Sequence, residues 1–180
     1  MDRLQSVLEA IDRVNAEDPV TEHDPASETE QARCLLYGQR MSQRLAAYRP
    51  DADECLQIAV RGQHIQRWAI PRSDYPEGRQ GYHRWRRRLY DYHAELIDEL
   101  MAAQGYDDNE RERAKNLSTR LSVMNRVLRH DIRTNVTIIK GHANHIRRGD
   151  VDPEQAAEVI IDQAEDLHEL SEEARRVEAH

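Results

Sequence analysis

The feature that most constrains this chain is the stretch from Tyr106 to Lys140, which contains neither glycine nor proline. These two residue types most often interrupt helices. The stretch therefore predicts one continuous helix from about residue 108 to 148, roughly 60 Å long at 1.5 Å per residue. Asp107 and Glu110 have the spacing of a capping box at its start, and Gly149 is expected to end it.

The composition also favours an all-α fold. Only 38% of the 180 residues are hydrophobic, 33% are charged and there is no Phe. Strands need alternating β-branched and aromatic residues, and this alternation is nearly absent. The remaining helices are expected at 3–14, 28–48, 54–66, 82–104 and 152–177, with Ser27 and Glu30, and then Asp51 and Glu54, at two of their starts.

Charge and cysteine usage limit the partners and the compartment. The net charge of -8 argues against a nucleic-acid partner, which needs a basic surface. Cys34 and Cys55 are expected to be reduced and structural. No apolar run reaches the roughly 18 residues of a membrane span, so a cytoplasmic location is expected.

The last third of the chain predicts a helical hairpin. Residues 117–148 carry a basic excess, whereas residues 150–180 are strongly acidic. Asp152 and Pro153 have the positions of an N-cap and a first helical residue after a tight turn. Two helices of opposite charge joined in this way should pair antiparallel. We place a domain boundary near residue 110, between a helical domain at 1–110 and a hairpin domain at 111–180.

His130 is the first candidate functional residue. Apolar residues follow the long helix at steps of three and four, and His130 is two residues from both Leu128 and Ile132. At about 100° per residue, this spacing places the ring opposite the apolar seam. Asp131 lies beside it and Thr134 follows one turn later. An exposed imidazole next to a carboxylate is a candidate nucleophile, although a surface histidine without a role fits the same pattern.

The segment VLRHDIRTNVTIIKGHANHI, followed by the acidic helix to about residue 178, resembles the histidine-kinase dimerisation and phosphoacceptor (HisKA) domain in its archaeal form. The resemblance implies that His130 accepts a phosphoryl group and passes it to a response regulator receiver domain. It implies that Asp131 is a general base and that Thr134 positions water during dephosphorylation. It also implies a homodimer, with two hairpins forming a four-helix bundle.

Two departures from that family affect the prediction. Asn135 stands where the family often has a proline that bends the helix. No ATP-binding catalytic domain follows the hairpin, so ATP is expected to act as phosphoryl donor only through a separate ATPase domain, and no bound cofactor is expected. Whether the chain is itself an enzyme stays open.

A second cluster of candidates surrounds the proline-containing loop at 68–81. Polar and aromatic side chains crowded at a long loop indicate a ligand pocket, although a helix corner held by aromatic residues and arginines fits equally well. The basic run RWRRR at 84–88 could contact phosphate, but on a helix of an acidic domain it is interpreted as a solvated face. The tentative ligand-binding residues are His64, Arg67, Trp68, Arg72, Tyr75 and His93.

The segments NAEDP, LLYGQRM, QHIQRWAIPRSDYP, GYHRWRRRL and YHAELIDELMAAQGY resemble domain-of-unknown-function family 4202 across about residues 7–106. That family's domain continues with a Lys-rich step and an acidic, apolar helix that this sequence lacks. The resemblance therefore implies an N-terminal domain without its C-terminal part.

The same region remotely resembles HD-type metal phosphohydrolases in its helical order and in His64 and His93. Tyr37 stands where their first metal-binding histidine is expected, and Ile65 follows His64 where they have aspartate. Histidines without carboxylates make a poor metal site, so no metal is predicted.

Three hypotheses remain at this level. The chain is a two-component-type signalling protein whose helical domain serves as an input or interaction module. Alternatively, the helical domain binds or hydrolyses a nucleotide or phosphoester, and the hairpin only dimerises. In the third, the chain is a gene fusion in which neither part is active.

Overall fold

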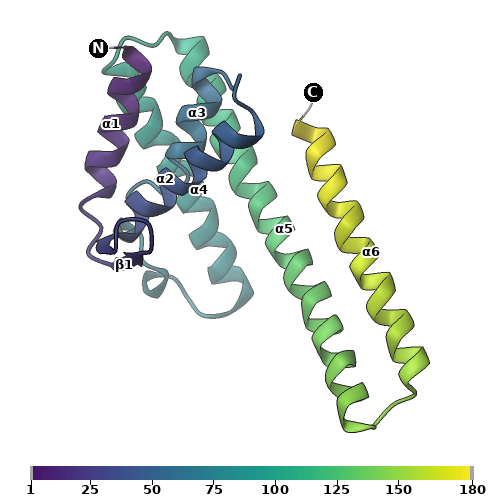
Figure 1. Cartoon of the computed structure of the whole chain (residues 1–180). Helices are drawn as coiled ribbons and strands as arrows, with labels where there is room; N and C mark the ends of the chain where they lie inside the picture. Colours follow the sequence, from purple (N-terminus) through teal and green to yellow (C-terminus); the bar gives the residue numbers. More distant parts are fainter. Residues whose placement is uncertain (1, 179–180) are drawn as a thin grey trace. The chain divides into compact units, whose positions relative to one another are not determined.

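The computed structural model describes the backbone of residues 2–178 and the side chains of residues 2–125 and 130–169 (Figure 1). The all-α prediction is confirmed, apart from one small two-stranded sheet. The chain divides into two compact units, residues 1–122 and residues 123–180. The elements are α1 (Arg3–Asn15), β1 (Thr21–Asp24), β2 (Thr29–Ala32), α2 (Arg33–Tyr48), α3 (Glu54–Arg61), α4 (Gly78–Ala102), α5 (Asp108–Arg148) and α6 (Pro153–Glu178), with 3₁₀ turns at Arg67–Ala69 and Arg72–Asp74.

The β1–β2 hairpin corrects the sequence prediction of a helix that begins near Glu28. The strands pair antiparallel from Thr21 opposite Ala32 to Asp24 opposite Thr29, and α2 begins only at Arg33. Asp24 organises the turn, because its carboxylate accepts hydrogen bonds from the Ala26 amide and the Ser27 hydroxyl. Ser27 thus belongs to a strand connection rather than to a helix cap, since the same side chain can satisfy either backbone.

The third helix also differs from its predicted bounds. It ends at Arg61 instead of Gln66, and its N-cap is Asp53 rather than Asp51, because the Asp53 carboxylate accepts from the Leu56 amide at 3.0 Å. The long helix was predicted correctly. Its capping box is reciprocal, with the Asp107 amide donating to Glu110 at 3.0 Å and the Glu110 amide donating to Asp107 at 2.9 Å.

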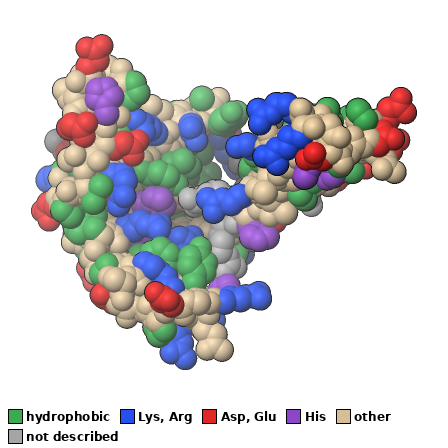
Figure 2. Space-filling model, turned by 90° about the horizontal axis from the view of Figure 1, so that it is seen from below, with side chains coloured by type: hydrophobic (Ala, Val, Ile, Leu, Met, Phe, Trp, Pro, Cys, Tyr) green, Lys and Arg blue, Asp and Glu red, His purple; other side chains and the backbone are tan. Residues whose placement is uncertain are grey.

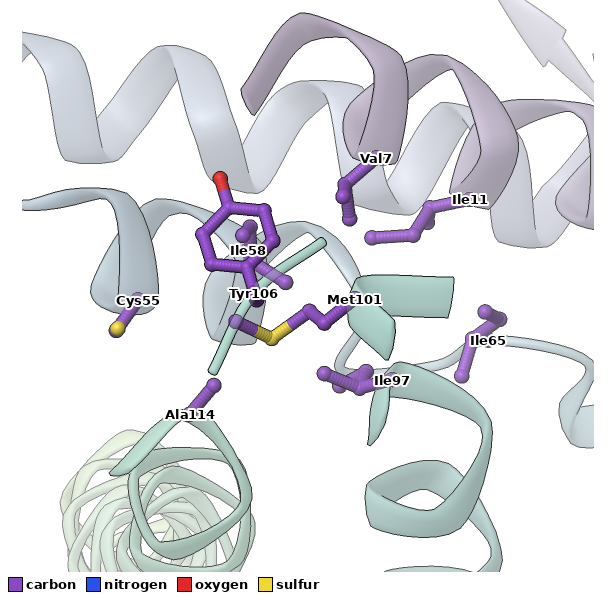
Figure 3. Close-up of a cluster of buried hydrophobic side chains, with 9 residues drawn as sticks. All are labelled: Val7, Ile11, Cys55, Ile58, Ile65, Ile97, Met101, Tyr106 and Ala114. Atoms are coloured by element: carbon purple, nitrogen blue, oxygen red, sulfur yellow. The ribbon is translucent and has the colours of Figure 1, made fainter. Parts of the chain in front are cut away.

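One aliphatic cluster forms the core of the first unit (Figure 3). Helices α1, α3 and α4 contribute most of its side chains, and the start of α5 adds one alanine. Ile97 and Met101 on α4 are completely buried there. Burying aliphatic side chains of this size contributes about 1.5–3 kcal/mol each. The buried members are Val7, Ile11, Cys55, Ile58, Ile65, Ile97, Met101, Tyr106 and Ala114.

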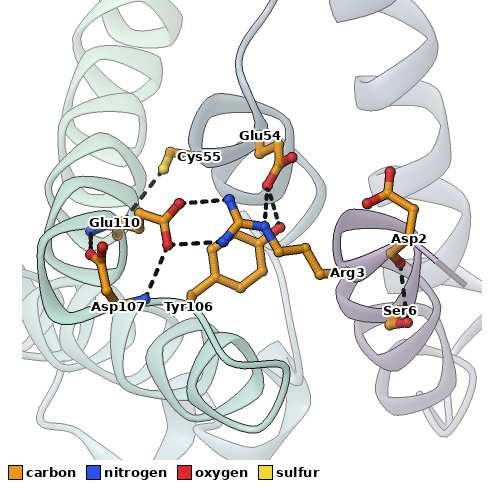
Figure 4. A network of polar contacts seen from close by, with 8 residues as sticks. All are labelled: Asp2, Arg3, Ser6, Glu54, Cys55, Tyr106, Asp107 and Glu110. Atoms are coloured by element: carbon orange, nitrogen blue, oxygen red, sulfur yellow. Dashed lines mark hydrogen bonds and ion pairs between the residues drawn. The ribbon is translucent and has the colours of Figure 1, made fainter.

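A polar network ties the start of α5 to α1 and α3 (Figure 4). The Arg3 guanidinium donates to Glu110 at 2.6 Å and to Glu54 at 3.1 Å, and it lies over the Tyr106 ring. The Tyr106 hydroxyl donates to Glu54 at 2.7 Å. Burial and the adjacent Glu54 carboxylate raise the pKa of Tyr106 above its ordinary value. The first turn of α5 is therefore fixed within the first unit.

In the second unit the chain reverses between α5 and α6, as Figure 1 shows. Gly149 adopts the left-handed conformation (φ 73°) that ends α5, and the Asp152 carboxylate accepts from the Glu154 amide at the start of α6. The turn was predicted correctly at both residues. Leu128 belongs to the apolar seam predicted for the long helix, and its side chain lies outside the described residues.

Both cysteines are buried and free, and burial raises the pKa of the Cys34 thiol to about 12. Among the described residues, no helix combines the length and the apolar character that a membrane crossing requires.

Candidate functional sites

The loop between α3 and α4 is held in place by contacts to its backbone carbonyls. The Trp85 indole donates to the Ile70 carbonyl at 2.9 Å, and the Arg72 guanidinium donates to the carbonyls of Tyr75 and Pro76. A Cβ atom at position 81 would lie 1.8 Å from the Pro76 oxygen, so only glycine fits there. These contacts fix the backbone conformation of the loop, and Arg72 has a structural role in it.

His64 and His93 lie close together, as the prediction of a ligand site in this region requires. Their ring centroids are 6.5 Å apart, and the His64 ring stacks on Tyr37 at 3.8 Å. The Arg67 guanidinium lies 3.5 Å from Nε2 of His64. Tyr37, which stands at the position of a metal ligand in HD-type enzymes, therefore packs against a histidine instead.

The remaining tentative residues lie further out. Tyr75 lines an open pocket of about 390 Å³ together with Ile70, Arg88 and Tyr92. Trp68 is half-buried in the 3₁₀ turn that begins at Arg67. The structure therefore brings His64, Arg67 and His93 together, whereas Arg72 and Tyr75 shape the loop beside them.

Sequence reasoning missed one residue of this site, Arg86. In the run RWRRR, Arg84, Arg87 and Arg88 are exposed as predicted, but Arg86 is only 8% exposed. It shares the core-facing stripe of α4 with Leu89, His93 and Ile97, all buried, at helical spacing. That spacing was the available signal. Figure 2 shows basic side chains interspersed with hydrophobic ones on one face of the molecule.

The environment of His93 disfavours its protonated form. The side chain is 2% exposed, and neither ring nitrogen makes a hydrogen bond of normal geometry among the described residues; the Gln63 backbone lies near the ring and only partly opposes the lowering of its pKa. Desolvation, followed by the positive charges of Arg67 and Arg86, lowers the pKa of His93 to about 3. The imidazole is therefore neutral at physiological pH, with one nitrogen a donor and the other an acceptor.

His130, in the second unit, has the opposite environment. Its side chain is 79% exposed on α5, and Nδ1 lies 3.1 Å from Oδ1 of Asp131. A carboxylate at Nδ1 favours the tautomer that carries its proton there and leaves the Nε2 lone pair directed away from Asp131. The predicted outward orientation of this ring is confirmed.

Thr134 lies one turn after His130 on the exposed side of α5. Its hydroxyl donates to the His130 carbonyl at 3.0 Å, which is the common back-bonding of threonine within a helix. Asn135 is half-buried, and α5 continues through it as an unbroken helix. The position where the kinase family often has proline is therefore regular here.

The second unit leaves several large aliphatic side chains exposed. Ile132 and Val136 on α5 are 46% and 40% exposed, and Ile161 on α6 is 55% exposed. Ile139 and Ile146 are half-buried. The predicted seam is thus divided between a half-buried face and an exposed one.

Within the described residues, no group of three or more histidine, cysteine, aspartate and glutamate side chains could hold a metal ion. The two histidines behind the loop have an arginine and a tyrosine as neighbours, which are poor ligands for a divalent cation.

Comparison with known protein families gives one match. Residues 5–135 match the family described as a domain of unknown function, DUF4202. The match confirms the resemblance found for the N-terminal part and extends past the proposed boundary at residue 110. No curated protein and no solved structure matches the chain. The resemblance of the C-terminal part to a phosphoacceptor domain stays a prediction.

Proposed function

We propose that this chain, which belongs to the DUF4202 family, is a two-component-type signalling protein in which His130 accepts a phosphoryl group. The supporting observation is the geometry of His130: an exposed ring on a long helix, with a carboxylate at Nδ1. The N-terminal unit would serve as the input or interaction module. Because α5 runs from one unit into the other, it would carry the signal.

The proposed reaction needs ATP bound to a separate ATPase domain. Nε2 of His130 attacks the γ-phosphorus, a new N–P bond forms, and the bond from phosphorus to the bridging oxygen of ADP breaks. Positive charge develops on the imidazole as this happens. The Asp131 carboxylate stabilises that charge at Nδ1 and accepts the Nδ1 proton. The N–P bond then breaks as the phosphoryl group moves to an aspartate of a receiver domain, and Asp131 returns the proton to Nδ1, which regenerates neutral His130.

Homodimerisation is part of this proposal. The exposed aliphatic residues Ile132, Val136 and Ile161 give the hairpin an apolar surface that water solvates poorly. A second hairpin packed on this surface would complete a four-helix bundle. Analytical ultracentrifugation of the full chain tests this expectation, which requires a dimer at micromolar concentration. A monomer at 100 μM would contradict it.

Phosphorylation is tested with the full chain, radiolabelled ATP and a HisKA-type ATPase domain supplied in trans. The wild type is expected to gain an acid-labile, alkali-stable label that His130→Gln lacks. His145→Gln is the matched control, because His145 is also half-exposed on α5, with Nδ1 3.5 Å from Asp150. Asp131→Asn should slow labelling roughly 100-fold. No label on the wild type, or an undiminished label on His130→Gln, contradicts the proposal.

A second function is supported by the proximity of His64, Arg67 and His93. In this alternative, the N-terminal unit binds or hydrolyses a nucleotide or phosphoester, and the hairpin only dimerises. Thermal shift of the full chain with nucleotides and phosphoesters, with and without Mn²⁺, tests it. A double variant of His64 and His93 that keeps every ligand response would contradict it.

A further inference from the structure

Arg86 carries a buried charge that no acidic side chain neutralises. Its side chain donates from Nε to the Tyr90 hydroxyl at 3.1 Å, and its guanidinium lies over the Tyr90 and Trp85 rings at 4.9 and 5.9 Å. No carboxylate forms an ion pair with it in the part of the chain that the structure describes. The guanidinium cannot lose its proton in a protein, so the charge is permanent.

A charge in this position is unfavourable without a counter-ion, because burial removes most of the side chain from water and contacts to aromatic rings replace only part of that hydration. Most buried charges in proteins are paired for this reason. Arg61, a half-buried arginine on α3, has such a partner, since it forms a two-fold ion pair with Asp12. Arg86 does not, which indicates that its counter-ion comes from outside the chain.

His93 supplies an independent observation that points to the same ligand. It lies two turns after Arg86 on the same stripe of α4, and both of its ring nitrogens are buried without a hydrogen-bond partner among the described residues. A buried polar group without a partner is unfavourable. The Arg67 and Arg86 guanidinium groups both lie over the Trp85 ring, at 5.2 and 5.9 Å. Arg67 also lies 3.5 Å from Nε2 of His64, whose ring centroid is 6.5 Å from that of His93. Two guanidinium groups and one imidazole without a partner thus lie in one region of the first unit.

We propose that Arg86, Arg67 and His93 form a binding site for a phosphate-type oxyanion, such as the phosphoryl group of a nucleotide or phosphoester. A tetrahedral oxyanion has enough acceptor atoms for two guanidinium groups and an imidazole N–H, and it neutralises the arginine charge. This inference deepens the second function above and rests on it. It does not depend on phosphoryl transfer to His130.

Thermal denaturation of the full chain in inorganic phosphate, at constant ionic strength, tests the site. Arg86→Met is the informative variant because it keeps the length of the side chain and removes the charge. Its phosphate affinity should fall at least tenfold, while its melting temperature without phosphate should equal or exceed that of the wild type. Arg87→Met is the matched control, since Arg87 is the next residue of α4 and is exposed. It should keep the wild-type response.

A purely structural role for Arg86 predicts the reverse. Arg86→Met would then melt at a lower temperature without phosphate and would keep the wild-type phosphate response. That result, or equal stabilisation of the wild type by acetate and phosphate, overturns the inference.

A measurement on the wild type keeps the inference testable if Arg86→Met does not fold. In nitrogen-15 NMR of the histidine rings, the His93 signals should shift with added phosphate until the site is saturated, while those of His130 stay in place. Unchanged His93 signals at 20 mM phosphate would refute the site. Failure of the site leaves labelling of His130 intact, and loss of labelling leaves phosphate binding intact, so the two proposals fail separately.

Discussion

The two units differ in how far their large aliphatic side chains are exposed to solvent. In the first unit, Ile97 and Met101 have no exposed surface, and the cluster around them draws on four helices. In the second unit, Ile132, Val136 and Ile161 keep 40% or more of their surface exposed. The proposed homodimer would account for this difference, because a second hairpin would cover the exposed surface of the second unit.

His93 in the first unit and His130 in the second unit differ in exposure in the same way. His93 is enclosed and neutral, and it faces two arginines, whereas His130 is exposed beside a carboxylate. A buried neutral imidazole suits the recognition of an anion, and an exposed imidazole with a carboxylate at Nδ1 suits nucleophilic attack. Under the two proposals above, ligand recognition would belong to the first unit and covalent chemistry to the second.

The largest effect is expected from Ile97→Ala. Removing three carbons from a completely buried site should destabilise the first unit by about 2–5 kcal/mol, because a cavity remains. Urea denaturation followed by tryptophan fluorescence reports on this unit alone, since Trp68 and Trp85 are the only tryptophans. A loss below 1 kcal/mol would mean that the core is not closed as described. Ile132→Ala is the control and should leave this transition unchanged.

The next effect comes from pH. The pKa of His93 is about 3 in the folded chain and about 6.5 when unfolded, so below pH 6.5 the unfolded state binds the extra proton. Stability is then fully present above pH 6.5 and declines by about 1.4 kcal/mol per unit as the pH falls toward 3. Between pH 6.5 and 5, His93 should therefore account for a loss of about 2 kcal/mol, measured by urea denaturation.

Substitution of His93 separates this contribution from other titrating groups. His93→Gln should remove about 2 kcal/mol of the pH dependence. Equal pH dependence in the wild type and His93→Gln would mean that the ring is solvated, and the contrast between the two histidines would be lost.

The smallest effect is expected from Ile132→Ala on self-association. The side chain is about half exposed, so a second hairpin would bury roughly 1 kcal/mol of its transfer free energy. Because both protomers carry the substitution, the loss is about 2 kcal/mol per dimer, and the dissociation constant should rise about thirtyfold. Sedimentation equilibrium of the full chain measures this. Arg133→Ala, at the next and also exposed position, gives the comparison for a polar residue. An unchanged constant for Ile132→Ala would place the dimer contact elsewhere.

The ends of helices could be predicted from the sequence where capping residues close in the chain determine them. The Asp107–Glu110 capping box, Gly149 and Asp152 each shape their own turn through contacts within a few residues, so these roles followed from spacing. Ser27 was misread because a hydroxyl caps a helix or closes a β-turn equally well, and Asp24 decides which. That choice depends on a residue outside the capping pattern.

The candidate sites were predictable to different degrees. The orientation of His130 followed from helical spacing alone, because an exposed residue needs no tertiary contact to face water. The pairing of His64 with Tyr37 required α2 to pack beside the loop, which no local pattern encodes. Arg86 was assigned to a solvated face by composition, although its spacing to Leu89 and His93 indicated the core.

The central claim is that Nε2 of His130 is the phosphoacceptor, and a proton–phosphorus NMR correlation on the labelled chain tests it most directly. Because Asp131 occupies Nδ1, the phosphorus signal should couple to ring protons of His130 in the pattern of a phosphate on Nε2. Coupling to another histidine, or a phosphate on Nδ1 of His130, would contradict the claim.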